Sequence, residues 1–160
     1  MAHILYWTSG GATESICNEL EQHLHSISVQ VTKQKIEERQ PKWGQWFRNV
    51  IRTSRRTGSD IEEVSIPSGT NVLVVAGPVW NWTCPSVLRS ALECIPEFDK
   101  TAVVIASCGS NPGDFVAEVQ RLLSKSQIVA SEIATNAIKR NPETRSQMLN
   151  RLIEAVKSHL

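Results

Sequence analysis

The residues best suited to chemistry lie in the loop at residues 8–13, between a short apolar run and an amphipathic helical pattern. Thr8, Ser9 and Thr13 carry hydroxyls, and two glycines let the backbone approach a ligand closely. N–H groups converge at the start of the following helix, where the helix dipole favours negative charge. The loop predicts a phosphate cradle, and a tight turn capped by Thr13 is equally compatible. Its spacing matches neither G-x-G-x-x-G nor G-x-x-x-x-G-K-[ST], which disfavours a dinucleotide fold and a P-loop NTPase.

Two tryptophans stand in a second loop, residues 77–85, which is polar and bounded by prolines. Trp80 and Trp82 are costly to expose, but they suit a site where a flat aromatic ligand stacks on one ring. Asn81 between them tolerates the left-handed backbone of a sharp loop apex. The alternative is that both rings cover the end of the sheet as part of the core.

A third loop, residues 107–113, is small, polar and punctuated by glycines. Taken alone it is an ordinary loop that offers backbone donors and acceptors. As the third member of the set, it predicts the polar edge of a pocket.

Each of these loops follows a short apolar run that predicts a buried strand, and helical patterns fill the intervals. Runs that are apolar on both faces belong in the middle of a parallel sheet, where helices cover both sides. The chain is therefore expected to form one α/β domain over residues 1–160, with a doubly wound five-stranded parallel sheet in the order 2-1-3-4-5. Ligands bind beyond the carboxyl ends of such strands. We expect strands at residues 4–7, 27–32, 72–76, 102–106 and 128–134, and helices at 13–24, 85–95, 116–123 and 148–160.

The composition is that of an ordinary globular protein, with 41% hydrophobic and 21% charged residues and a net charge of +1. That charge does not point to nucleic acid as a partner. No run approaches the ~18 apolar residues of a spanning helix, so we expect no transmembrane segment, and the N-terminus lacks a signal-peptide pattern. The four cysteines are scattered without a C-x-x-C pair, which indicates reduced thiols in a cytoplasmic protein and supports no metal site.

In the order of its loops, the chain resembles the flavodoxin family. Residues 4–13 are similar to that family's first strand and phosphate loop, which runs approximately [TS]-x-T-G-x-T. Residues 74–80 and 85–89 are similar to its third strand, flavin-stacking loop and next helix, and residues 102–113 to its fourth strand and third loop. The resemblance implies that FMN is bound without a covalent link. It assigns the phosphate to Thr8, Ser9, Gly11 and Thr13, in a cofactor-binding loop that also contains Gly10 and Ala12. It assigns the ring system to Pro78, Val79, Trp80, Asn81 and Trp82, and the pyrimidine edge to Ser107, Cys108, Gly109 and Gly113.

Several residues depart from the family pattern. Gly10 stands where the family prefers a second threonine, and Ala12 where it often has a polar residue, so the cradle keeps its backbone donors but loses hydroxyls. The third loop lacks the tyrosine that many electron-transfer flavodoxins place over the flavin, because the chain's only tyrosine is Tyr6. One flavin face is then expected to be open to a second molecule.

The resemblance implies an FMN-binding redox protein that acts in electron transfer or as a flavin-dependent reductase. The second loop also resembles NAD(P)H-dependent FMN reductases, so the electron donor is expected to be either NAD(P)H or a redox partner protein. Both functions are compatible with the sequence. The alternative is a flavodoxin-like domain without FMN that serves as an interaction or scaffolding module.

Residues 42–56 combine five basic side chains with three aromatic ones and contain no acidic residue. Helical spacing relates Trp43, Trp46, Phe47, Val50 and Ile51, so we expect a second helix whose apolar side packs on the sheet. The alternatives are an anionic contact through the arginines, such as a nicotinamide dinucleotide phosphate, and an acidic or membrane-surface partner.

Overall fold

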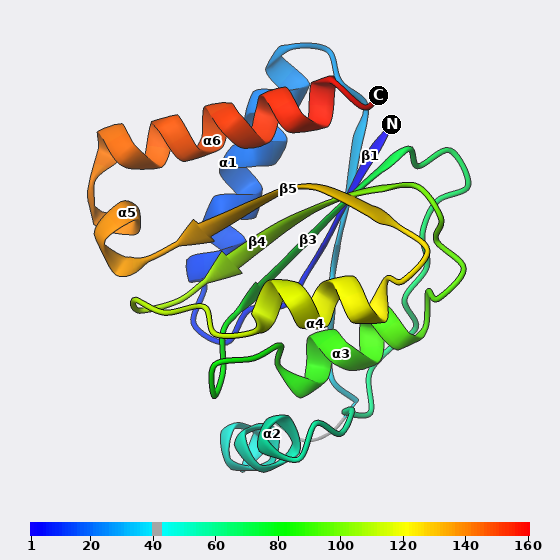
Figure 1. Cartoon of the computed structure of the whole chain (residues 1–160), viewed down its shortest axis with the longest axis vertical. Coiled ribbons are helices and arrows are strands. Elements are labelled where there is room, and N and C mark those ends of the chain that lie inside the picture. The colour runs from blue at the N-terminus through cyan, green and yellow to red at the C-terminus, as the bar shows by residue number, and fades with distance from the viewer. Residues whose placement is uncertain (40–42) are drawn as a thin grey trace.

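The computed structural model describes residues 1–39 and 43–160 of the chain. Five strands form one parallel sheet in the order β2-β1-β3-β4-β5, which confirms the predicted doubly wound α/β fold (Figure 1). The strands are β1 (Ala2–Tyr6), β2 (Val31–Lys35), β3 (Val72–Pro78), β4 (Thr101–Ser107) and β5 (Gln127–Ala134).

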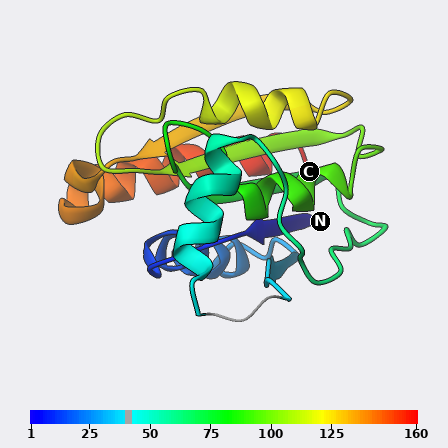
Figure 2. The same ribbon diagram turned by 90° about the horizontal axis from the view of Figure 1, so that it is seen from below.

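Helices cover both faces of this sheet, as predicted. One face is covered by α1 (Ala12–Ser26) and α6 (Pro142–Lys157), and the other by α3 (Ser86–Glu93) and α4 (Phe115–Leu122). The short helix α5 (Asn136–Arg140), which the sequence pattern did not predict, connects β5 to α6. The helix α2 (Gln45–Ser54) lies beyond the end of the sheet, below α3 in Figure 1 and nearest the viewer in Figure 2.

The two central strands separate two hydrophobic cores. Val72 and Val74 of β3 point into the core under α1 and α6, whereas Leu73 and Val75 point into the core under α3 and α4. Both faces of β3 and β4 are buried, so these strands need an apolar residue at nearly every position. This requirement is why β3 and β4 were predicted within a few residues of their ends.

The edge strand β2 corrects the predicted strand at residues 27–32, because it spans Val31–Lys35 instead. The helix α1 continues to Ser26, and the chain then turns at Ser28, whose φ is +62°. The N–H groups of Ile27 and Val29 both donate to the carbonyl of Leu24, at 3.3 and 2.9 Å. The alternation that suggested a strand thus falls partly within a helix-terminating turn.

The orientation of α2 corrects a second prediction. The aromatic side chains in and just before this helix do not pack on the sheet: Trp43, Trp46 and Phe47 are exposed to solvent, whereas Asn49 and Thr53 of the helix are buried. The physical reason is that these two polar side chains find hydrogen-bond partners inside the protein. Lys42, which was predicted to begin this segment, lies outside the described residues.

Candidate functional site

The three predicted loops lie at one edge of the sheet, the carboxyl edge. In the parallel register Tyr6 lies opposite Ala76 and Pro78 lies opposite Ser107, so β1, β3 and β4 end side by side. The strand order reverses between β1 and β3, and open α/β sheets bind ligands beyond the strand ends at this point.

The loop at residues 8–13 is built around a hydrogen bond from the Gly11 N–H to the Thr8 Oγ1, 2.9 Å long. Gly11 has a φ of +80° and caps α1 without a side chain, which leaves the first N–H groups of the helix without a side-chain cap. A Cβ built on Gly10 or Gly11 meets no atom within 4 Å. Ser9 and Ala12 are exposed, whereas Thr13 is buried. The backbone therefore borders open space next to the positive end of a helix dipole, and this arrangement suits an anionic group.

The second loop places Trp80 in a fixed orientation. Its ring packs edge-on against Trp7, with centroids 5.2 Å apart and planes inclined by 72°. Backbone hydrogen bonds join Trp80 and Thr83 in both directions, at 3.0 and 3.2 Å, and close a tight turn. Asn81 and Trp82 at the apex have φ values of +48° and +59°, so Asn81 has the left-handed conformation expected there.

A cavity of about 320 Å³ brings the first two loops together. Three of the predicted site residues, Thr8, Ser9 and Trp80, line it beside Trp7. Its volume is in the range of small-molecule pockets, about 300–1,000 Å³. The remaining lining residues were not predicted as site residues and come from the end of β2 and from α2: Lys35, Ile36, Glu37, Gln45, Trp46 and Asn49. Trp46 belonged to a segment whose aromatic side was expected to face the core, so its place at a cavity was missed.

Trp82 does not line that cavity. Its side chain is 68% exposed and borders a separate hollow of about 370 Å³, together with Arg56 and Asp114. Gly113 lies directly beneath it, because a Cβ on Gly113 would be 1.9 Å from the Trp82 carbonyl oxygen. Of the two tryptophans in the second loop, only Trp80 shares a cavity with Thr8 and Ser9.

The third loop is held between its neighbours by backbone hydrogen bonds. The Ser107 carbonyl accepts from the Val79 N–H at 2.8 Å, which joins this loop to the second loop just after Pro78. On the other side, the Cys108 N–H donates to Ala134 at 3.1 Å, and the Gly109 carbonyl accepts from Asn136 at 3.1 Å. Ser107, Cys108 and Gly109 are not part of the cavity lining around Trp80.

Lys139 on α5 is a charged residue at this edge that the sequence analysis missed. Its Nζ donates to the Cys108 carbonyl at 3.1 Å and to the Ser107 Oγ at 3.3 Å. Burial lowers the pKa of this amine and raises the pKa of the Cys108 thiol. No local pattern indicated Lys139, because the short helix that carries it was not predicted.

Arg145 on α6 brings a second cation to the start of α1. Its guanidinium donates to the Ser15 Oγ at 2.8 Å and forms an ion pair with Glu19. The arginine therefore joins the first turns of α1 to α6 and stands near the glycine loop without adding a net charge there.

No protein-family model matches the chain, and no curated protein matches it in sequence. Solved structures share its fold. A flavoprotein in complex with FMN from Lactobacillus acidophilus aligns with a TM-score of 0.69 and 8% identity, over 83% of this chain and 92% of that one. The two-electron reduced flavodoxin of Megasphaera elsdenii aligns with a TM-score of 0.62 and 16% identity, over 99% of both chains. Oxidised flavodoxin 2 from Bacillus cereus aligns with a TM-score of 0.62 and 13% identity, over 100% of this chain and 99% of that one. The chain therefore has the flavodoxin-like fold over nearly its whole length.

Proposed function

We propose that this chain binds FMN and acts as a redox protein, with the phosphate in the loop at residues 8–13 and the flavin ring against Trp80. The observation that carries the proposal is the open backbone at Gly10 and Gly11, beside an α1 N-terminus without a side-chain cap. Thr8 and Ser9 of the same loop share a cavity with Trp80, so one ligand with a phosphate and a flat ring can reach both. The flavoproteins of the same fold support this assignment.

Each part of the proposed site has its own task. Backbone N–H groups at the start of α1 and the Ser9 hydroxyl bind the phosphate. Trp80, supported by Trp7, covers one face of the ring and excludes water from it. The backbone of Cys108 and Gly109 borders the pyrimidine edge. Bound FMN supplies the electron-transfer chemistry, and the protein supplies position and electrostatics.

The second face of the ring is proposed to be open to an electron donor. The third loop reads Ser-Cys-Gly-Ser-Asn-Pro-Gly, so it has no aromatic side chain to cover the face opposite Trp80. Either NAD(P)H or a redox protein can serve as the donor. Anaerobic mixing of the FMN-loaded protein with NADPH separates the two cases, because rapid bleaching of the flavin absorbance is expected only for an NAD(P)H-linked reductase.

We also propose a cytoplasmic location, on the basis of the cysteines. Cys17, Cys84, Cys94 and Cys108 are all free, and three of them are buried. Free buried thiols are typical of reducing compartments.

The second candidate function, a cofactor-free interaction module, is favoured by one observation, the outward-facing aromatic residues of α2. Titration of the purified protein with FMN decides between the two functions. We expect FMN to bind with a change in its fluorescence, and riboflavin, which lacks the phosphate, to bind at least about tenfold more weakly. If neither flavin binds, the redox function is wrong and the interaction module is favoured.

A further inference from the structure

The helix α2 is amphipathic, but its polar side faces the protein. The Asn49 Nδ2 donates to the Glu38 carboxylate at 2.6 Å, and its Oδ1 accepts from the Ser59 hydroxyl at 3.2 Å. One turn later, the Thr53 Oγ1 accepts from the Ser86 N–H at 3.0 Å, at the start of α3. Asn49 and Thr53 are fully buried, so these hydrogen bonds fix which side of the helix is turned inward.

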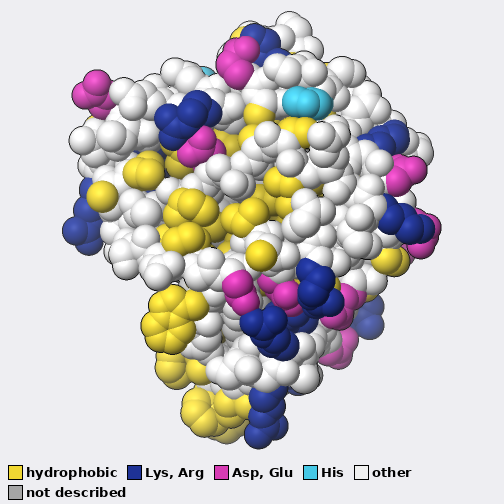
Figure 3. All heavy atoms as spheres, in the orientation of Figure 1, with side chains coloured by type: hydrophobic (Ala, Val, Ile, Leu, Met, Phe, Trp, Pro, Cys, Tyr) yellow, Lys and Arg dark blue, Asp and Glu magenta, His cyan; other side chains and the backbone are white. Residues whose placement is uncertain are grey.

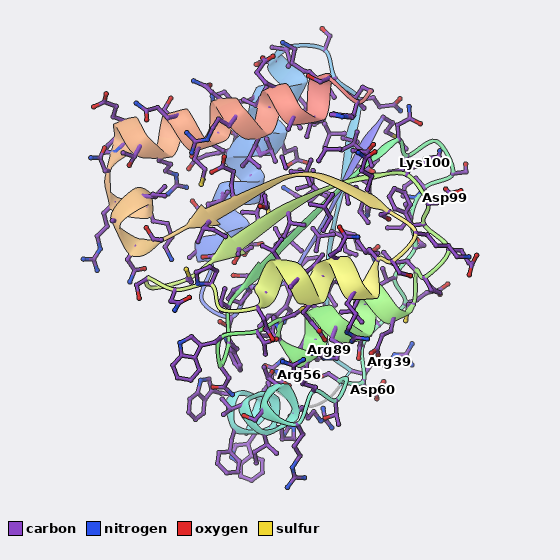
Figure 4. The ribbon with its side chains drawn as sticks, viewed as in Figure 1. Arg39, Arg56, Asp60, Arg89, Asp99 and Lys100 are labelled. Atoms are coloured by element: carbon purple, nitrogen blue, oxygen red, sulfur yellow. The ribbon has the colours of Figure 1, made fainter. Side chains whose placement is uncertain are left out.

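Charged groups reinforce this attachment at the end of the helix. Arg56, just after α2, forms an ion pair with Asp114 at 2.6 Å and lies 3.8 Å from the Glu118 carboxylate. Glu118 is buried and also pairs with Arg89 of α3. Figure 4 shows Arg56 and Arg89 close together between α2 and α3. The inner side of α2 is therefore anchored by hydrogen bonds and ion pairs rather than by apolar packing.

The outer side of α2 carries large apolar side chains in contact with solvent. Trp43 is 88% exposed, Trp46 66% and Phe47 63%. Ile51, one turn after Phe47, is exposed as well. Figure 3 shows hydrophobic side chains protruding at the lower end of the molecule, where α2 lies. Exposed aromatic residues clustered in this way mark a surface that another body covers.

Trp82 of the second loop extends this patch. The Asn81 Nδ2 next to it donates to the Val50 carbonyl at 3.2 Å and to the Ser54 Oγ at 2.7 Å, so the loop apex is tied to α2. We call the exposed apolar side chains Trp43, Trp46, Phe47, Ile51 and Trp82 the aromatic face.

The charge carried by the segment that contains α2 is of one sign. Residues 43–59 contain four arginines, Arg48, Arg52, Arg55 and Arg56, and no acidic residue. Two copies of the chain that met through this face would bring their arginines together, which disfavours a self-interface. The charge is instead complementary to an anionic surface.

We propose that the aromatic face of α2 docks on an anionic lipid surface, with its rings in the headgroup region and the side chains of Arg52 and Arg55 on lipid phosphates. Tryptophan and phenylalanine together with arginines on one helix are typical of helices that lie in a membrane interface. The face is a protruding helix rather than a groove, which suits a deformable lipid surface better than a rigid acidic protein. No helix within residues 1–39 and 43–160 is long and apolar enough to cross a bilayer.

Vesicle flotation with the full chain, in the presence of FMN, tests this proposal. We expect the protein to float with vesicles of phosphatidylcholine and phosphatidylglycerol but not with pure phosphatidylcholine, and to be released by high salt. The double variant Trp43→Gln, Phe47→Gln should lose flotation. Arg52→Gln and Arg55→Gln should each weaken partitioning about fivefold. Ile27→Gln is the matched control, because Ile27 is an exposed apolar residue just after α1 and outside the aromatic face, and it should float as the wild type does.

Three outcomes would overturn the proposal. The first is a folded protein that does not float with anionic vesicles, and the second is unchanged flotation of the Trp43→Gln, Phe47→Gln variant. The third is binding to another partner in place of the vesicles. A concentration-dependent dimer would assign the aromatic face to a second copy of the chain, and tight binding to soluble polyglutamate without flotation would assign it to an acidic protein. Flotation is measured without FMN as well, so these outcomes are distinct from a failure of the proposed redox function.

Discussion

Trp80 stands edge-on against Trp7, with ring centroids 5.2 Å apart and ring planes inclined by 72°. Trp7 is buried directly after β1, so the contact ties the second loop to the first strand. The Trp80 ring is thereby held in one direction before any ligand arrives. Such pre-organisation lowers the ordering cost of binding.

The first prediction concerns stacking. Replacing Trp80 with alanine should weaken FMN binding by about 1–3 kcal/mol, the range measured when an aromatic side chain that stacks on a base is removed. Fluorescence titration measures the change. Trp82→Ala is the matched control, because Trp82 lies in the same loop but lines a different hollow, and it should leave the affinity nearly unchanged. A loss in Trp82→Ala alone would assign the stacking to the other ring.

The second prediction concerns the phosphate cradle. Gly10 has open space around a built Cβ and no positive φ, so aspartate is tolerated there without strain. The Gly10→Asp carboxylate should repel the phosphate and weaken FMN binding about tenfold or more, while riboflavin binding stays the same. Gly10→Asn, which has the same shape without the charge, should bind FMN nearly as the wild type does. Equal losses for FMN and riboflavin would contradict a phosphate site in this loop.

The third prediction concerns Lys139, whose amine donates a hydrogen bond to the Cys108 carbonyl. If the third loop borders the flavin, this cation stabilises negative charge on the reduced ring. Lys139→Met should then shift the reduction potential of bound FMN to more negative values. The lost charge–charge interaction between the ammonium group and the reduced ring amounts to about 1–2 kcal/mol per electron at an effective dielectric constant of about 20. Lys139→Arg should keep most of the wild-type potential. Spectroelectrochemical titration provides the measurement, and equal potentials in all three proteins would place the amine out of reach of the ring.

The fourth prediction concerns the pH dependence of stability. His3 in β1 is buried and its Nδ1 is 2.7 Å from the Thr32 Oγ1; burial lowers its pKa below the usual 6.5. The unfolded chain then binds a proton that the folded chain does not, so stability falls as the pH drops below 6.5. The contribution of His3 to the slope of the free energy of unfolding against pH is at most about 1.4 kcal/mol per pH unit. Urea unfolding between neutral and mildly acidic pH should be less pH-dependent in His3→Gln, and an unchanged slope would contradict a neutral buried histidine.

The fifth prediction concerns the anchoring of α2. Thr53→Val removes the acceptor of the buried Ser86 N–H, which should lower the free energy of unfolding by about 1–3 kcal/mol. Thr57→Val, at an exposed threonine just beyond the helix, should change it by less than about 0.5 kcal/mol. Chemical denaturation measures both. Similar stabilities for the two variants would mean that the polar contacts do not hold the helix.

The sequence was sufficient where one local pattern determines the structure. Val72 and Ala102 begin runs that are apolar on both faces, and such runs belong only in the middle of a covered sheet. The three loops follow from those strands, because parallel strands place their carboxyl ends at one edge. The order of the strands followed from the fold rules and from the resemblance to flavodoxins.

The predictions were wrong or incomplete where the structure depends on partners that are far away in the sequence. The apolar spacing of α2 predicted inward-facing aromatics, but Asn49 and Thr53 bind Glu38, Ser59 and Ser86, and the last of these is more than 30 positions along the chain. Lys139 reaches Cys108 across a similar separation. Periodicity cannot register such partners, because it describes which residues share a side of a helix and not what that side meets.

Trp46 lines the same cavity as Thr8, Ser9 and Trp80. The exposed part of the Trp46 side chain belongs to the outer side of α2. One ring therefore borders both proposed binding sites. Thermodynamic linkage requires that the factor by which FMN changes the affinity for a surface on α2 equals the factor by which that surface changes the affinity for FMN. The two equilibria form a closed cycle, and flotation measured at increasing FMN concentration gives the coupling free energy directly.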